Sequence, residues 1–113
     1  MKNRVPSDPE RLEHILNAIE AIEAFIRNMT EEEFLGNIKT QSAVLYQFVI
    51  IGEAVASLSM ELTERNPYTW HKPRSFRNFI AHEYYGIQLW VVWYTIKEQL
   101  PELKTLITKI QQS

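Results

Sequence analysis

The feature that most constrains this fold is the helical spacing of its apolar residues. They recur at steps of three and four along most of the 113 residues, as on one face of an α-helix. No stretch alternates with a period of two over any length, so we expect no sheet. The length fits one domain, residues 1–113. The expected fold is all-α, an up-and-down bundle of four main helices plus short helices.

Start and stop signals set the expected helix boundaries. Asp8 is expected to cap the first helix, with Pro9 at its first position. Gly86 is expected to be a left-handed cap after the third main helix. Residues 89–96 (LWVVWYTI) are rich in strand-forming types, yet their spacing fits a helix. The expected helices run from Asp8 to about Asn28, over a short segment near Thr30–Glu33, from about Thr40 to Thr63, from Lys72 to about Glu83, from about Gln88 to Gln99, and from Pro101 onward.

Composition excludes several classes of protein. Cysteine is absent, which rules out disulfides, thiolate metal sites and a cysteine nucleophile. Three glycines cannot form a glycine-rich phosphate loop. The longest apolar run, Leu89–Tyr94, is far shorter than the roughly 20 residues of a membrane helix, and no apolar segment follows the N-terminus. We therefore expect a cytoplasmic protein that has no membrane association and needs no cofactor.

The net charge of −2 hides a division along the chain. Residues 1–64 hold five cations and eleven acids, whereas residues 65–113 hold seven cations and three acids. No acid lies between Glu64 and Glu83, a stretch that contains four cations. Such asymmetry can mark a site for an anionic ligand. The alternative, which charge alone favours, is that the basic half pairs with the acidic half. The four cations are Arg65, Lys72, Arg74 and Arg77.

A polar cluster within residues 74–86 (RSFRNFIAHEYYG) is the candidate site. On an ideal helix Asn78 and His82 share a face, whereas Arg77 and His82 diverge by about 140°. The helix could loosen at His82, the long Arg77 side chain could reach around the helix, or a second subunit could complete the site. Geometry alone favours a solvated helix end over a site.

The spacing of Arg77 and His82, followed by Glu83-Tyr84, resembles the R-x4-6-H motif of the HEPN superfamily. The R-x4-H-x-Y form is that of the HepT-like toxins. Glu83 stands where aspartate is common in relatives, and glutamate keeps the charge. The resemblance covers about Asp8 to Ile107 and implies a HEPN-type bundle as a single HepT-like domain. It also includes the segments HILNAIEAIEAFI, AVLYQFVIIGEA, NPYTW and WYTIKEQLPELK.

The resemblance implies a metal-independent ribonuclease that acts as a toxin. Its antitoxin partner would be an MntA-like minimal nucleotidyltransferase, which silences such toxins by transferring AMP to the motif tyrosine. The chemistry suits the side chains, because histidine moves protons near neutral pH and arginine binds phosphate oxygens with a fork of donors. The resemblance also implies a homodimer with the motif at its interface. Carried over, Arg77 and His82 are catalytic and Tyr84 accepts AMP. Beside them, Asn78 and Glu83 are expected to support the site, and a polar filler on the helix is an equal alternative for Asn78. Lys72 and Arg74 could contact RNA phosphates, with a solvated basic face as the equal alternative. No residue is expected to bind a metal.

Two other classes of function remain open. The chain could be a non-catalytic HEPN module that binds nucleotide or RNA or docks a nucleotidyltransferase, or a plain helical interaction domain. The intact arginine, histidine and tyrosine favour the ribonuclease.

Other notable residues have mainly structural interpretations. Gly52 lies inside a helix at a cost of about 1 kcal/mol relative to alanine, which suggests close helix packing. Glu53, if partly buried, would need a partner. Trp70 is the best candidate for base stacking, although a core position is expected. His14 and His71 are expected on the surface.

Overall fold

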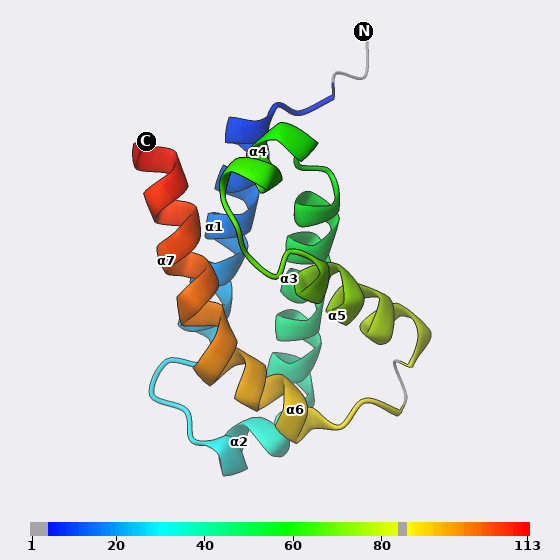
Figure 1. Cartoon of the computed structure of the whole chain (residues 1–113). Coiled ribbons are helices and arrows are strands. Elements are labelled where there is room, and N and C mark those ends of the chain that lie inside the picture. The colour runs from blue at the N-terminus through cyan, green and yellow to red at the C-terminus, as the bar shows by residue number, and fades with distance from the viewer. Residues whose placement is uncertain (1–4, 84–85) are drawn as a thin grey trace, which may run out of the picture.

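The computed structural model describes residues 5–83 and 86–113, and helices are the only regular secondary structure in these ranges (Figure 1). The all-α expectation is confirmed, including the helical state of residues 89–96. The elements are α1 (Asp8–Phe25), α2 (Glu31–Leu35), α3 (Ile38–Ala56), α4 (Met60–Arg65), α5 (His71–His82), α6 (Leu89–Tyr94), a π-helical turn (Thr95–Gln99) and α7 (Leu100–Gln112).

Three long helices, α1, α3 and α7, run along the bundle, and α5 lies across α3 (Figure 1). Each of the three directs an apolar stripe inward, for example Ile15, Val44 and Ile107, which are fully buried. By contrast, α5 buries only Ile80 completely, while Phe76 packs edge-on against Phe48 of α3. Helix α5 is therefore a peripheral element that leaves most of its polar residues exposed.

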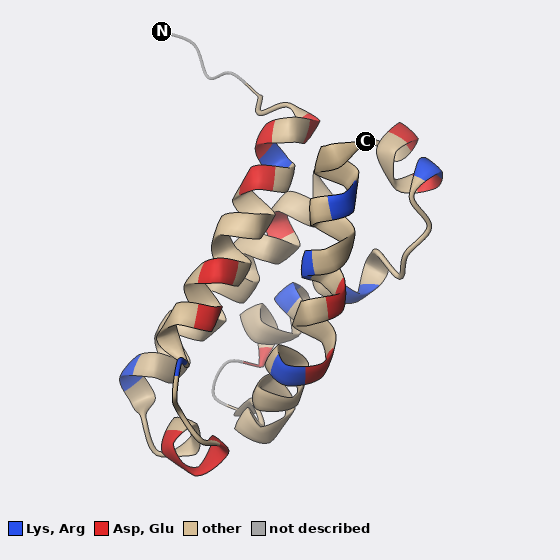
Figure 2. Cartoon of the chain, turned by 90° about the vertical axis from the view of Figure 1, so that its left-hand side faces the viewer, with Lys and Arg blue, Asp and Glu red and all other residues tan. Residues whose placement is uncertain are grey.

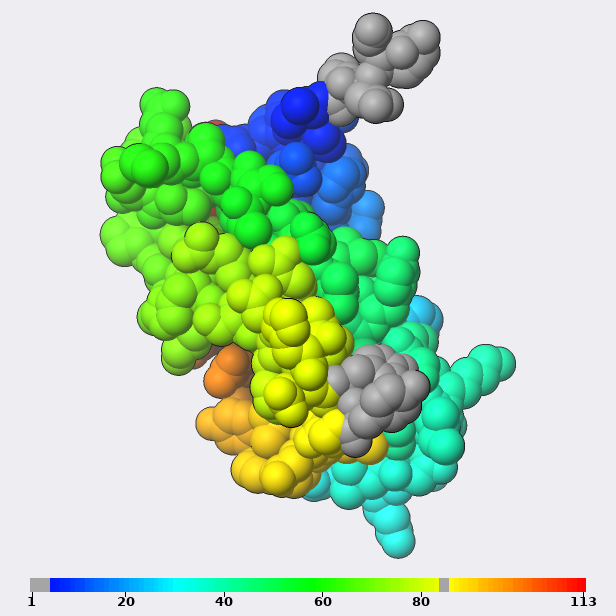
Figure 3. Space-filling view, turned by 90° about the vertical axis from the view of Figure 1, so that its right-hand side faces the viewer, coloured from blue at the N-terminus to red at the C-terminus, as the bar shows by residue number. Residues whose placement is uncertain are grey.

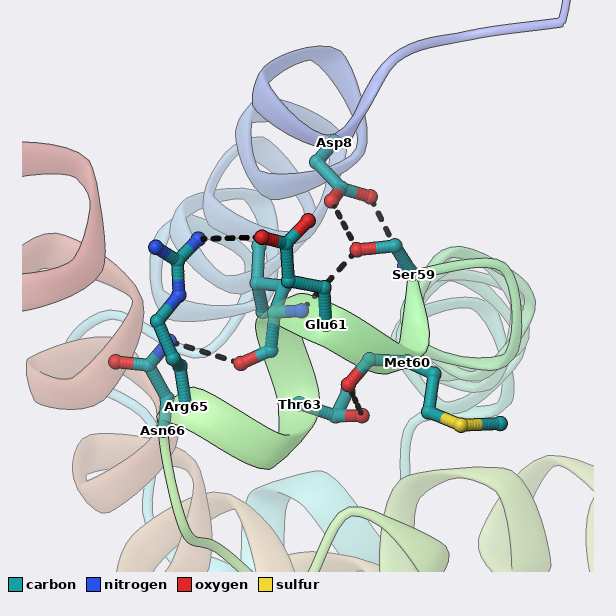
Figure 4. Close-up of polar contacts among 8 residues, drawn as sticks. Asp8, Ser59, Met60, Glu61, Thr63, Arg65 and Asn66 are labelled. Atoms are coloured by element: carbon teal, nitrogen blue, oxygen red, sulfur yellow. Dashed lines mark hydrogen bonds and ion pairs between the residues drawn. The ribbon is translucent and has the colours of Figure 1, made fainter.

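The first helix begins one residue earlier than its expected cap implies. Ser7, not Asp8, is the cap: its hydroxyl accepts the Glu10 N–H at 3.4 Å, and the Glu10 carboxylate accepts the Ser7 N–H at 2.9 Å. The expectation for Asp8 was wrong, because its carboxylate has another partner. It accepts the N–H of Ser59 at 3.0 Å and the hydroxyl of Ser59 at 2.6 Å (Figure 4).

The single helix expected from about Thr40 to Thr63 is instead two helices, α3 and α4. The chain leaves α3 at Ser57, and Ser59 caps α4 by accepting the Leu62 N–H at 3.1 Å. Apolar spacing continues through the break, so periodicity could not reveal it. The break is stabilised by a long-range contact, the bond between Ser59 and Asp8 (Figure 4).

Three other boundaries differ from the sequence expectation. Helix α1 ends at Phe25, and Asn28 takes the left-handed conformation with φ 62°. Gly86 is not a left-handed cap, since no described glycine has a positive φ; Glu83 ends α5 instead. The break expected before Pro101 is a π-helical turn that leads directly into α7. Widening the turn relieves the clash that a proline ring makes with the carbonyl four residues earlier.

The pairing of the two chain halves is visible in the charges (Figure 2). Acidic residues of α1 lie beside the lysines of α7, and Lys104 Nζ donates to Glu23 Oε1 at 2.8 Å. This hydrogen bond raises the pKa of Lys104. No helix in the described part of the chain is long and apolar enough to cross a bilayer.

Candidate active site

The candidate site begins where α5 crosses α3 at Gly52. A Cβ atom on Gly52 would overlap the Cβ of Arg77, and it would lie 2.8 Å from Arg77 Cγ and 2.9 Å from the carbonyl oxygen of Pro73. Only glycine permits this approach without displacing backbone. The expectation of close packing at Gly52 is confirmed, and the residue packed against it is Arg77.

Arg77 is held by one residue from each of the two crossing helices. Its Nη1 lies 2.8 Å from Glu53 Oε2, and its Nε donates to Asn78 Oδ1 at 2.9 Å. The Arg77 side chain is 22% exposed and that of Glu53 is 61% exposed. Glu53 thus has a partner but is not buried. Arg77 is fixed at the surface rather than mobile in solvent.

The two hydrogen bonds leave donors of Arg77 for a ligand. A guanidinium carries five N–H groups, and these bonds use Nε–H and one Nη1–H. Within residues 5–83 and 86–113, the second Nη1–H and both Nη2–H groups have no hydrogen-bond partner. A fork of this kind matches two oxygens of a phosphate or phosphorane.

His82 is the last residue of α5 and is exposed to solvent. The helix is regular as far as His82, and Glu83 leaves it with φ −124° and ψ 31°. Loosening of the helix before His82 therefore does not occur, and the directions of Arg77 and His82 differ by about 140° around its axis. Within one protomer the two side chains do not converge on one point.

Other expected site residues line the outer surface of α5. Arg74, Asn78 and His82 follow one another at four-residue steps, so they form one exposed row. Lys72, Arg74 and Glu83 are exposed, and the described residues give their side chains no ion pair. Figure 3 shows α5 lying over α3 on one face of the molecule. Tyr84 lies outside the described residues.

The structural interpretation of Trp70 is confirmed. It is 8% exposed, its Nε1 donates to the Asn66 carbonyl at 2.9 Å, and its ring meets Tyr68 edge-on. It is therefore a core residue and not a platform for bases. His14 and His71 are exposed, as expected. The described residues contain no group of three His, Asp or Glu side chains that could hold a metal ion.

Sequence reasoning missed the role of Glu53. The available signal was the position of Glu53 directly after a mid-helix glycine. A second helix that packs closely against the glycine can also bring a polar partner to the residue that follows it. The identity of that partner depends on which helix crosses at Gly52, and this is a tertiary contact across 24 positions of sequence.

Comparison with known families gives one clear match. A family model described as "Ribonuclease HepT-like" matches residues 15–110, which include all of α3 and α5. A protein of Thermococcus cleftensis named "Probable ribonuclease HepT" is 36% identical over 107 residues, covering 94% of this chain and 97% of that protein. A protein of Caldanaerobacter subterraneus, provisionally named as an RNase, is 31% identical over 102 residues. The match covers 89% of this chain and 91% of that protein.

One relative is much longer than this chain. A protein of Methanocaldococcus jannaschii, named as a gamma-glutamylcyclotransferase and provisionally as an RNase, is 36% identical over 102 residues. The match covers 89% of this chain but only 46% of that protein. No solved structure matches the chain significantly.

Proposed function

Because the chain belongs to the HepT-like ribonuclease family, we propose that it cleaves RNA, with Arg77 and His82 as its catalytic residues. The observation that carries the proposal is the guanidinium of Arg77, which two hydrogen bonds hold in place on the same helix as an exposed histidine. Among the residues that the structure describes, three of its N–H groups have no partner and could bind a phosphate. Exposed Lys72 and Arg74 extend the cationic surface toward the start of α5 and would contact further phosphates of the RNA.

The proposed chemistry needs no metal ion, because RNA carries its own nucleophile. The 2′-oxygen attacks the adjacent phosphorus and forms a 2′-O–P bond while the P–O5′ bond breaks. One imidazole takes the proton of the 2′-hydroxyl, and a protonated imidazole gives a proton to the departing 5′-oxygen. Arg77 binds the phosphorane oxygens as negative charge develops on them. The products are a 2′,3′-cyclic phosphate and a 5′-hydroxyl.

A homodimer would supply both imidazoles. One His82 per chain cannot be base and acid in the same cleavage, and Arg77 and His82 of one chain diverge around α5. A two-fold axis beside α5 would place two copies of each residue in one cleft. An apolar groove next to α5 supports this arrangement, and a second copy of the chain would cover it. The groove lies between α3 and α5 and is lined by Ser42, Leu45, Tyr46, Val49, Ile80 and Ala81.

The biological role that we propose is that of a cytoplasmic toxin controlled by an MntA-like nucleotidyltransferase. This enzyme would transfer AMP from ATP to the phenolic oxygen of Tyr84, releasing pyrophosphate. The added phosphodiester would place negative charge two residues after His82 and repel the RNA phosphate. The intact mass of the protein tests this after incubation with the partner and ATP. Wild type should gain mass in AMP units and lose activity, whereas Tyr84→Phe should remain active and gain no mass at this position; an equal gain on both would contradict the role of Tyr84.

The experiment that tests the ribonuclease is cleavage of total cellular RNA by the purified protein, with and without EDTA. Wild type should cleave equally in both conditions. His82→Ala should lose at least about 100-fold in rate, the typical worth of one positioned proton transfer. Arg77→Ala should also lose at least about 100-fold, because it removes the donors that stabilise the developing negative charge. His71→Ala, an exposed histidine eleven residues earlier on the same helix, is the matched control and should cleave as wild type does. A fully active His82→Ala protein, or cleavage that requires a divalent ion, would contradict the proposed chemistry, whereas a wild-type protein that cuts no RNA would favour the non-catalytic module.

A further inference from the structure

The pair Gly52-Glu53 has no part in the proposed chemistry, yet it contacts the central residue of the site. Gly52 lets α5 approach until the stem of Arg77 lies against the backbone of α3. Glu53, the next residue on α3, then accepts a hydrogen bond from Nη1 of Arg77 at 2.8 Å. Two adjacent residues of α3 therefore fix the Cβ and Cγ atoms of Arg77 and the position of its guanidinium.

We propose that Glu53 is a positioning residue that orients the guanidinium of Arg77 for the phosphate; this inference rests on the proposed ribonuclease function. Glu53 holds Nη1 from α3, and Asn78 holds Nε from α5. Two bonds to different atoms of a planar group define its orientation, because rotation about either bond would break the other. The directions of the three remaining N–H groups are then fixed as well.

Removal of Glu53 has two expected effects that act in opposite directions on RNA cleavage, one through charge and one through the orientation of Arg77. This difference makes the role of Glu53 testable. A carboxylate next to a phosphate site lowers the local positive potential, so its removal strengthens the attraction of RNA. Loss of orientation instead slows the chemical step, because misplacement of a catalytic group by about 1 Å can cost on the order of 100-fold. If Glu53 positions Arg77, then Glu53→Ala lowers kcat while KM stays unchanged or falls.

The contact between α1 and α7 supplies a matched control. Glu23 of α1 accepts a hydrogen bond from Lys104 of α7, also at 2.8 Å, and its side chain is 40% exposed. Glu23→Ala removes the same charge and the same kind of interhelical ion pair without any contact with α5. Any general effect of the charge on folding or on RNA attraction appears in this variant too.

The experiment measures kcat and KM on a fluorescently labelled single-stranded RNA of mixed sequence, together with the Nε–H signal of Arg77 in NMR spectra, assigned with Arg77→Lys. We expect Glu53→Ala to lower kcat at least about ten-fold, with KM unchanged or lower, and to speed exchange of the Arg77 Nε–H with water. Glu53→Gln retains an oxygen acceptor, so its kcat should fall between those of wild type and Glu53→Ala. Glu23→Ala should match wild type in both measurements.

Two kinds of result would overturn the inference. One is a kcat of Glu53→Ala within about two-fold of wild type, or no lower than that of Glu23→Ala. The other is an unchanged Arg77 Nε–H signal in Glu53→Ala, which would show that the carboxylate does not restrain the guanidinium. Cleavage by wild type that is lost in Arg77→Ala establishes the ribonuclease independently. If wild type cuts no RNA, the proposed function fails, while the NMR signal still decides whether Glu53 fixes Arg77.

Discussion

At the scale of single residues, the site depends on one missing methyl group. Gly52 faces Arg77 and the carbonyl of Pro73 at distances that no Cβ could occupy unchanged. The neighbours are a backbone oxygen and the root of a side chain, neither of which can move far. Gly52 is therefore important both for stability and for the candidate site, because the contact that packs α5 onto α3 also positions Arg77.

Gly52→Ala should destabilise the fold even though alanine favours helices. Overpacking costs about 1–3 kcal/mol, whereas the gain in helix propensity is at most about 1 kcal/mol. We expect a lower free energy of unfolding in denaturant titrations, together with reduced RNA cleavage because α5 shifts.

Gly36→Ala is the matched control for this prediction. A Cβ on Gly36 would meet its nearest atoms, the carbonyl oxygens of Glu32 and Glu33, at the ordinary distances of 3.7 and 3.9 Å. Its stability should lie within about 0.5 kcal/mol of wild type. A Gly52→Ala protein as stable as this control would show that the α3–α5 contact is not tight.

The sequence indicates which residues form the candidate site, but not their contacts with other helices. Arg77, His82 and Asn78 stand out from their motif and spacing, and the structure has all three on α5. The bond from Arg77 to Glu53 could not be predicted, since it depends on the angle at which α5 crosses α3. Glu53 carried only the general expectation that a mid-helix acid needs a partner.

At the scale of elements, the boundaries of helices follow local chemistry except where a distant residue intervenes. The Thr30–Glu33 capping box and the start of α5 agree with the sequence expectation. The break between α3 and α4 does not, because apolar spacing runs through it and its stabilising partner, Asp8, lies 51 residues away. Apolar spacing alone therefore does not locate a helix break that a distant residue stabilises.

The contact between Asp8 and Ser59 gives a prediction at this scale. Ser59→Ala removes both hydrogen bonds of the hydroxyl, namely the cap bond from the Leu62 N–H and the bond to Asp8. We therefore expect a loss of about 1 kcal/mol in the free energy of unfolding. Asp8→Ala removes the interhelical bonds alone and should cost somewhat less. In the double variant the loss should be smaller than the sum, because the two residues share the same hydrogen bonds.

Ser57→Ala is the control, since its side chain makes no hydrogen bond within the described part of the chain and its stability should match wild type. Strict additivity of Asp8→Ala and Ser59→Ala would contradict the contact seen in Figure 4.

At the scale of the whole molecule, charge is distributed in a way that composition conceals. Two interhelical ion pairs, Lys104–Glu23 and Arg77–Glu53, join cations of the C-terminal half to acids of the N-terminal half. The alternative suggested by charge alone is thus correct for these pairs. Lys72 and Arg74 remain exposed on α5 beside the candidate site.

A mixing experiment tests the proposed dimer. A heterodimer of a wild-type chain and a His82→Ala chain would hold a single imidazole in the shared cleft, whereas the mechanism needs two. After subunit exchange with excess His82→Ala, the activity per wild-type chain should therefore fall well below that of wild type alone. An active monomer in light scattering, or unchanged activity per wild-type chain after demonstrated exchange, would contradict the shared cleft.

In the proposed mechanism the 2′-hydroxyl of RNA is the nucleophile, and protein side chains alone move its proton. The most direct test is analysis of the cleaved ends after digestion in EDTA. We predict a 2′,3′-cyclic phosphate on one fragment and a 5′-hydroxyl on the other, with no cleavage at a 2′-deoxy position. Fragments that end in a 3′-hydroxyl and a 5′-phosphate, or cleavage at the 2′-deoxy position, would contradict it.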